Sequence, residues 1–163
     1  MARVLIVGCG CRGRELAACL IAAGHAVRGT TRSPDRLAAI EATGAEAALA
    51  DPDRLGTLLP ALTGVSAVCW LMGTAAGARA SVAALHGTRL SSMLEKLVDT
   101  PVRGVVYEAA GTASPELFDE GAAIARKVAV TYRMPVRIVD RRPADAAGWV
   151  AAMRAGVEAV LSE

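Results

Sequence analysis

The chain has 163 residues, of which 53% are hydrophobic and only 3% aromatic, which is enough apolar material for the core of one domain and excludes a disordered chain. Its net charge of +2, with basic and acidic residues interspersed, gives no basic tail or patch, so we expect no nucleic-acid partner. Glycines and charges interrupt the N-terminal apolar run before it could form a signal peptide or a membrane span. We therefore expect a cytoplasmic protein that is not associated with a membrane.

Short apolar runs alternate with longer segments of helical spacing along the whole chain. This pattern predicts repeated βα units around a parallel sheet, and the runs lack polar alternation, as burial on both faces requires. The predicted strands are Arg3 to Val7, Ala26 to Thr30, Ala45 to Ala48, Ala67 to Leu71, Gly104 to Ala109 and Val136 to Asp140. Nothing in the sequence marks a second domain, so we expect a single α/β domain over residues 1–163.

Helices are expected between the strands and after the last one. Ser33 before Pro34 and Ser114 before Pro115 are helix start signals, and Gly24 and Gly44 follow two of the helices as C-terminal caps. The predicted ranges are Gly13 to Ala23, Pro34 to Thr43, Asp53 to Leu62, a stretch from Ala80 to Val98 that Gly87 splits, Pro115 to Tyr132 and Ala144 to Leu161.

Three glycines follow the first predicted strand at the start of the first helix. Gly8, Gly10 and Gly13 form G-x-G-x-x-G in the strand-turn-helix context that predicts dinucleotide binding. The first glycine permits the sharp turn, the second lets the backbone approach a pyrophosphate, and the third allows close packing of helix on strand. The alternative is a purely structural turn.

The end of the second predicted strand favours NADP over NAD. An NAD site places Asp or Glu about twenty residues after the glycines, whereas this chain has Thr31, Arg32 and Ser33. A guanidinium flanked by hydroxyls suits the 2′-phosphate of NADP. Arg12 could assist from the glycine turn, where Cys11 is also a candidate cofactor residue. The alternative is that Arg32 is a solvated loop residue.

The stretches "GCGCRG", "GHAVRGTTRSPDRLAAIEATGAEAALAD" and "LHGTRLSSMLEKLVDTPVRGVVYEAAG" resemble the extended and atypical short-chain dehydrogenase/reductases, the NAD(P)-dependent epimerase/dehydratase superfamily. The resemblance runs from about Val4 to Asp140 and implies a Rossmann-type, doubly wound sheet in the order 3-2-1-4-5-6. It also implies that Asp51 lies beside the adenine, that Leu71, Met72 and Gly73 lie along the cofactor, and that Ala110 ends the fifth strand near the nicotinamide.

The chain departs from the family at the catalytic positions. The family places Ser or Thr after the fifth strand and then a Tyr-x-x-x-Lys pair, in which lysine lowers the pKa of the tyrosine. Here Ala109 and Ala110 replace the hydroxyl, and Lys127 has Ala123 four residues before it. The weak catalytic candidates that remain are Thr112 and Ser114, and Glu108 is expected to be a surface or hydrogen-bonding residue.

The sequence leaves the function open between two classes. One is an NADP(H)-dependent oxidoreductase or a relative of the epimerases and dehydratases, acting on an unidentified small molecule. The other is a non-catalytic NAD(P)-binding redox sensor or a regulatory or interaction protein.

The remaining cysteines and histidines are not assigned to a site. Cys9 and Cys11 could chelate a soft metal, but we expect no metal site, with Cys9 a filler of the turn and Cys19 and Cys69 buried thiols. His25 and His86 are expected to be structural or exposed.

The last helix carries Trp149, Val150, Met153, Val157 and Leu161 at helical spacing. This face could cover the sheet or form the interface of a homodimer.

Overall fold

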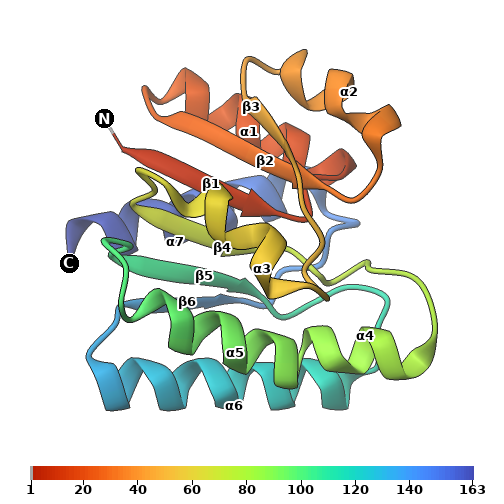
Figure 1. The fold of residues 1–163 in the computed structure, drawn as a ribbon, viewed down its shortest axis with the longest axis vertical. Coiled ribbons are helices and arrows are strands. Elements are labelled where there is room, and N and C mark those ends of the chain that lie inside the picture. Colours follow the sequence, from red (N-terminus) through yellow and green to blue (C-terminus); the bar gives the residue numbers. More distant parts are fainter. Residues whose placement is uncertain (1) are drawn as a thin grey trace.

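The computed structural model describes residues 2–163 and contains one six-stranded sheet in which every neighbouring pair is parallel. The strands follow one another in the order β3-β2-β1-β4-β5-β6, from the top to the bottom of Figure 1. They are β1 (Arg3–Val7), β2 (Ala26–Thr31), β3 (Glu46–Leu49), β4 (Ala67–Trp70), β5 (Gly104–Glu108) and β6 (Val136–Val139). This confirms the predicted Rossmann-type sheet and its strand order.

The sheet separates two hydrophobic cores because successive side chains of a strand point to opposite faces. In β1, Leu5 and Val7 belong to one core, and Val4 and Ile6 belong to the other. The central strands β4 and β5 are buried along their whole length, and β1 is buried from Val4 to Val7. Burial on both faces is therefore the reason that these runs show no polar alternation in the sequence.

Helices cover both faces of the sheet. The core that contains Leu5 includes residues of α5 and α6, and the opposite core includes residues of α1 and α7; α4, α5 and α6 lie together at the bottom of Figure 1. The helices are α1 (Cys11–Ala22), α2 (Leu37–Glu41), α3 (Leu55–Leu58), α4 (Arg79–Leu85), α5 (Thr88–Leu97), α6 (Pro115–Tyr132) and α7 (Ala146–Ser162).

Two predicted helices are shorter than expected. The one predicted from Pro34 begins as a 3-10 turn over Pro34–Arg36 and is α-helical only in α2. The one predicted from Asp53 starts at Leu55, because Asp51 accepts a hydrogen bond from the backbone N–H of Asp53 (2.9 Å) and holds a turn there. It becomes 3-10 after α3, where Pro60 lacks the N–H that would continue the α-helix.

The other helix signals are found where they were expected. The stretch from Ala80 to Val98 is divided into α4 and α5 at His86 and Gly87. Gly24 and Gly44 have φ of +94° and +91°, a left-handed conformation that glycine adopts without strain. In α7, Trp149, Met153 and Val157 are fully buried against the sheet, so this helical face covers the sheet.

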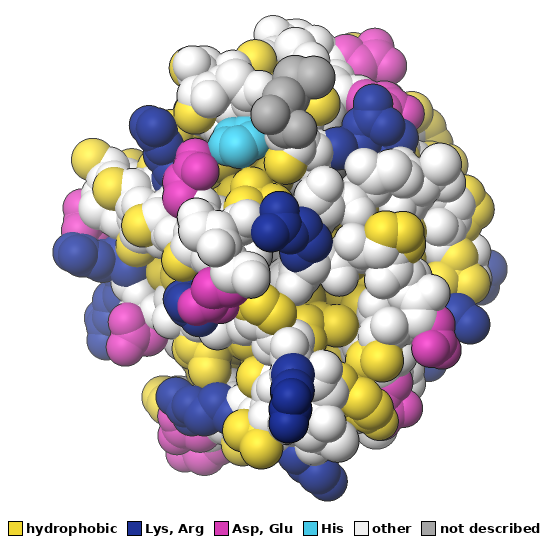
Figure 2. All heavy atoms as spheres, turned by 90° about the vertical axis from the view of Figure 1, so that its left-hand side faces the viewer, with side chains coloured by type: hydrophobic (Ala, Val, Ile, Leu, Met, Phe, Trp, Pro, Cys, Tyr) yellow, Lys and Arg dark blue, Asp and Glu magenta, His cyan; other side chains and the backbone are white. Residues whose placement is uncertain are grey.

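Charged side chains of both signs are interspersed on the face drawn in Figure 2. Among residues 2–163, no helix combines the length and the apolar content that crossing a membrane requires.

Candidate functional site

A cleft of about 430 Å³ lies where β1, β2 and β4 end, at the carboxyl edge of the sheet. In open parallel sheets this edge binds ligands where neighbouring crossovers run to opposite faces. The lining includes these predicted cofactor residues: Gly8, Gly10, Thr31, Arg32, Ser33, Leu71 and Met72. Three separate segments of the sequence thus form one site.

The glycines of the turn have different structural roles. Gly8 has φ of +84°, and a Cβ there would collide with the carbonyl oxygen of Leu71, so the fold itself requires glycine at this position. Gly13 is buried in α1, where a Cβ would lie 3.3 Å from the carbonyl oxygen of Gly8. Gly10 has an ordinary φ of −82°, and a Cβ there would meet no atom within 4 Å. The fold therefore does not require glycine at position 10, and the space that a side chain would occupy there is open.

The first backbone N–H groups of α1 follow directly after Gly10, which lines the cleft. The N–H of Cys9 donates to the carbonyl of Thr30 (2.9 Å), that of Gly10 to the carbonyl of Gly8 (2.9 Å) and that of Arg14 to the carbonyl of Gly10 (2.8 Å). Between them, the amides of Cys11 and residues 12–13 have no acceptor within residues 2–163, and α1 has no side-chain cap. Free N–H groups and the helix dipole make this end of α1 suited to an anion.

Two arginines stand at the end of β2. Arg32 and Arg36 both line the cleft and are exposed. The hydroxyl of Thr31 accepts from the N–H of Ser33 (3.1 Å) and shapes the turn between them. Arg36 was not predicted as a cofactor residue, although the helix start signal at Ser33 and Pro34 indicated a helical turn that would return Arg36 to the side of Arg32.

Other predicted cofactor residues do not line the cleft. Arg12 donates through Nε to the carbonyl of Pro143 (2.9 Å) and through Nη1 to Glu15 (2.8 Å), so its side chain is bound to its own helix and to the loop before α7. Cys11 is exposed at the start of α1 and does not line the cleft. The carboxylate of Asp51 caps a turn, while its neighbours Ala50 and Pro52 line the cleft.

Gly73 and Ala110 are buried where the segment after β4 packs closely against the segment after β5. A Cβ on Gly73 would collide with the carbonyl oxygen of Ala110, and a Cβ on Gly111 would collide with that of Gly73. The N–H of Thr112 donates to the carbonyl of Gly73 (2.9 Å). Neither Gly73 nor Ala110 lines the cleft, but Gly73 directly follows Leu71 and Met72, which do.

A smaller cavity of about 240 Å³ adjoins the cleft and shares Ala75 and Ala76 with it. Thr112 and Ser114, the weak catalytic candidates, both line this cavity, together with Arg79. Its lining, from residues 75 to 117, contains no carboxylate, histidine, cysteine or tyrosine. The cavity therefore offers hydroxyls and a guanidinium, but no group that exchanges a proton readily near neutral pH.

Glu108 ends β5 as a buried carboxyl with 3% of its surface exposed. Its Oε1 accepts from the N–H of Gly73 (2.8 Å) and its Oε2 from Nε1 of Trp149 (2.8 Å). Burial raises the pKa of Glu108 from 4.5 to about 7, although both hydrogen bonds act to lower it. The structure confirms the predicted hydrogen-bonding role and shows that the residue is not at the surface.

His86 approaches the same segment from the other face of the sheet. Its Nε2 lies 3.1 Å from the carbonyl oxygen of Met72 and its Nδ1 lies 2.7 Å from the hydroxyl of Tyr107. Burial lowers the pKa of His86, which favours the neutral ring. Because a carbonyl only accepts, Nε2 carries the proton and Nδ1 accepts from Tyr107. His86 is thus structural, as expected.

All four cysteines are free thiols. Cys9 is buried in the turn and Cys69 in β4, and burial raises the pKa of Cys9 to about 11 and that of Cys69 to about 12. Cys19 is only half-buried, which corrects the prediction of a core thiol, because α1 turns this position toward α7 rather than toward the sheet. No group of three or more metal-ligating side chains occurs in the part of the chain that the structure describes.

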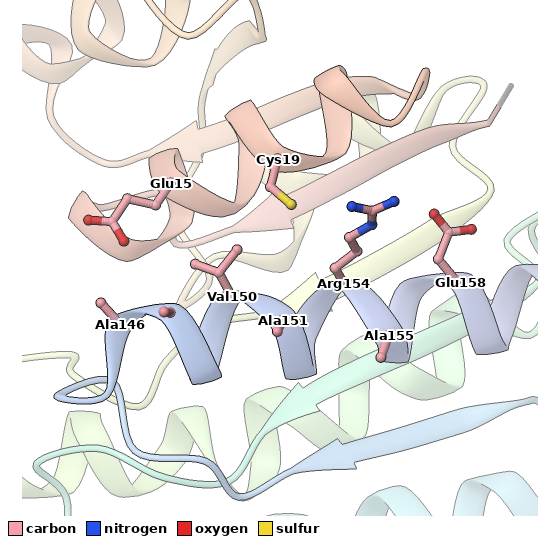
Figure 3. Close-up of a pocket in the computed structure, with 9 residues that line it drawn as sticks. Glu15, Cys19, Ala146, Val150, Ala151, Arg154, Ala155 and Glu158 are labelled. Carbon is pink, nitrogen blue, oxygen red and sulfur yellow. The ribbon is translucent and has the colours of Figure 1, made fainter.

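A third cavity, of about 610 Å³, lies between α1 and α7 (Figure 3). Alanines of α7 and Val150 line it, with Cys19, Arg154 and Glu158 at its sides. Glu158 is bound by His25 (3.0 Å), and Glu15 is bound by Arg12. None of the predicted cofactor residues lies in this groove, so it is separate from the cleft.

No protein-family model and no curated protein sequence matches the chain. The fold, in contrast, has many counterparts among solved structures. A short-chain dehydrogenase/reductase superfamily protein from Agrobacterium tumefaciens with bound NAD is 21% identical, with a TM-score of 0.69, over 83% of this chain and 48% of that one. The UDP-glucuronic acid 4-epimerase of Bacillus cereus in complex with NAD is 15% identical, with a TM-score of 0.68, over 86% and 56%.

The triphenylmethane reductase of Citrobacter sp., complexed with NADP(H), is 17% identical with a TM-score of 0.62, over 83% of this chain and 48% of the reductase. The chain shares their fold. It spans about half the length of these three proteins. The similarity confirms the predicted resemblance at the level of the fold, and what each neighbour binds or transforms remains a property of that neighbour.

Proposed function

We propose that the chain binds a nicotinamide dinucleotide in the cleft, as an atypical relative of the short-chain dehydrogenase/reductases. The carrying observation is the empty space at Gly10, beside the free amides of Cys11 and residues 12–13. A pyrophosphate fits there because those amides supply donors and the helix end supplies partial positive charge. The solved structures of similar fold that contain NAD or NADP(H) support the same ligand class.

Replacing Gly10 tests this assignment directly. Gly10→Ala is expected to fold normally, because its φ is unstrained and its Cβ meets no protein atom, but to lose binding of NADPH and NADH, because the methyl group occupies the space of the pyrophosphate. Cofactor fluorescence measures the binding and thermal unfolding measures the stability.

Gly56→Ala is the matched control for this variant. It adds a methyl group that also meets no atom, in α3 and outside the cleft, and should leave both affinities unchanged. Failure of the unmodified chain to bind either cofactor, or unchanged affinity in Gly10→Ala, would contradict the proposal.

The favoured cofactor is NADP(H). Arg32 and Arg36 line the cleft at the end of β2, where the ribose of the adenosine half would lie, and no carboxylate is among the lining residues. Neither guanidinium forms a salt bridge within residues 2–163, so both are available to a 2′-phosphate.

Arg32→Ala is expected to weaken NADPH binding about 10- to 100-fold and to leave NADH binding within about twofold, since only NADPH carries the charged group that the guanidinium would bind. Titrations of both cofactors against Arg32→Ala and Arg36→Ala measure this. Arg154→Ala, on α7 and outside the cleft, is the control for loss of one positive charge. Equal losses for the two cofactors would assign Arg32 to a site other than the 2′-phosphate.

Two functions are compatible with cofactor binding, one catalytic and one not. A bound nicotinamide supplies hydride chemistry, and the small cavity lined by Thr112, Ser114 and Arg79 is where we place a substrate if the chain is an oxidoreductase. The absence of a readily titrating side chain among its lining residues favours the second candidate, a cofactor-binding protein without turnover. Oxidation of NADPH with a panel of aldehydes, ketones and quinones separates the two. The predicted homodimer and the cytoplasmic location stay predictions.

A further inference from the structure

The segment Leu71–Gly73, which we call the cleft wall, is held by hydrogen bonds on both of its sides. The N–H of Leu71 donates to the carbonyl of Val7 (3.0 Å), and the carbonyl of Met72 accepts from His86 (3.1 Å). Gly73 donates its N–H to Glu108 (2.8 Å) and accepts at its carbonyl from Thr112 (2.9 Å). The side chains of Leu71 and Met72 line the cleft. Glu108 binds the backbone of the wall at Gly73 but lines none of the three cavities.

The two partners of Glu108 are both donors. The N–H of Gly73 meets one carboxylate oxygen, and Nε1–H of Trp149 meets the other. Neither group can accept a hydrogen bond. A protonated Glu108 would therefore turn an O–H toward one of these donors and lose that hydrogen bond. Trp149 is fully buried within α7, whereas Gly73 lies in a loop, so the bond to Gly73 is the one with freedom to open.

We infer that Glu108 is a positioning residue for the dinucleotide site: as a carboxylate it fixes the cleft wall, and its protonation releases Gly73 and weakens cofactor binding. This inference rests on the proposed binding function. It adds that the affinity of the cleft is linked to protons, with tight binding at alkaline pH and weaker binding at acidic pH, and that the cofactor displaces a proton from Glu108 when it binds near neutral pH.

The other titratable groups near Glu108 keep one charge state between pH 6.5 and 8.5. Burial raises the pKa of Cys69, on β4, to about 12 and also raises that of the adjacent Tyr107, and Glu108 itself contributes to both shifts. Cys9, the next thiol, has a pKa of about 11. On the far side of the wall, burial keeps the pKa of His86 below 6.5. Glu108, with a pKa of about 7, is the group that changes charge between pH 6.5 and 8.5.

The first measurement uses the unmodified protein without cofactor. In proton NMR spectra recorded from pH 5 to 9, the indole N–H resonance of Trp149, assigned with Trp149→Phe, should shift with a midpoint near 7, and the amide of Gly73 should shift with it. The Trp149 resonance should not shift in Glu108→Gln. A Trp149 resonance that does not respond to pH overturns the inference, whatever the cofactor does.

The second measurement is cofactor affinity against pH. From pH 8 to pH 6 the dissociation constant for NADPH should rise about tenfold in the unmodified protein and should rise much less in Glu108→Gln, which keeps an acceptor but cannot change charge. Titration of the 2′-phosphate of NADPH is common to both proteins and cancels in the comparison. Glu95→Gln, an exposed carboxyl on α5, is the matched control and should retain the tenfold change.

Trp149→Phe distinguishes positioning from a general loss of structure. It removes a donor to the carboxylate, which should raise the pKa of Glu108 and move the midpoint of the NADPH profile to higher pH. Calorimetry at pH 7 in buffers of different ionisation enthalpy should show proton release on binding that is absent in Glu108→Gln. Binding with the same pH profile in all variants overturns this inference and leaves the proposed function standing, whereas absence of binding at every pH overturns both.

Discussion

At the residue scale, some glycines of the glycine turn are required by the backbone and one is not. Gly8 is fixed by a left-handed φ and by the nearby carbonyl of Leu71, whereas Gly10 has neither constraint. The same distinction applies to charged groups. Arg28 is buried because its guanidinium binds the carbonyls of Ala61 (2.5 Å) and Thr63 (3.0 Å), whereas Glu108 is buried despite a pKa displaced toward neutrality. Gly10, which the backbone does not require, is therefore the residue that points to a ligand.

Glu108 should make the stability of the protein depend on pH. Its pKa in the folded state is about 7, against 4.5 for the ordinary group, so the folded state binds the proton more tightly. The resulting stabilisation is complete below pH 4.5 and is lost as the pH rises to 7, by up to ~3 kcal/mol. Glu108→Gln removes this change. Urea unfolding of both proteins at pH 5 and pH 8 measures it, and His86, common to both, cancels. Equal changes in the free energy of unfolding would contradict the assigned pKa.

At the element scale, the sequence predicted which segments form strands more accurately than it predicted the short helices. Strand ends differ from the prediction by at most one residue, because each strand is a short segment rich in apolar residues that lies between turn and helix signals. The short helices α2 and α3 depend on local hydrogen bonds, such as that of Asp51 to the N–H of Asp53, and on Pro60, which periodicity does not detect. Among the long helices, α6 was predicted with its observed bounds, whereas α1 begins two residues earlier and α7 two residues later than predicted.

Two glycines in helices should respond to alanine in opposite ways. In α6, a Cβ on Gly121 would collide with the hydroxyl of Tyr107, which is fully buried and hydrogen-bonded to His86, so Gly121→Ala should destabilise the fold by about 2 kcal/mol or more. In α3, a Cβ on Gly56 meets no atom, so Gly56→Ala should stabilise by about 0.5–1 kcal/mol through the higher helix propensity of alanine. Thermal and urea unfolding measure both. A destabilised Gly56→Ala or a neutral Gly121→Ala would contradict this description of the packing.

At the scale of the whole molecule, the parallel sheet brings the candidate site together from three distant segments of the sequence. The glycine turn, the end of β2 and the cleft wall could be predicted because the strand order places their ends side by side. The side-chain directions could not. Arg12 lies within the predicted motif but is bound to Pro143, 131 residues further along the chain. Glu108 depends likewise on Trp149, 41 residues away. Such partners are set by the packing of α7 against the sheet.

The double support of the cleft wall also has an entropic consequence. While Glu108 is a carboxylate, Leu71–Gly73 is already ordered by four hydrogen bonds in the free protein. Fixing the backbone of one flexible residue costs about 1–2 kcal/mol at room temperature, and a ligand that orders a loop must supply that free energy from its own contacts. Here the three residues of the wall are already ordered by folding, so the ligand does not have to supply this free energy. A cofactor bound in this cleft would therefore lose none of its contact energy to ordering the wall, although the chain spans only about half the length of these structural neighbours.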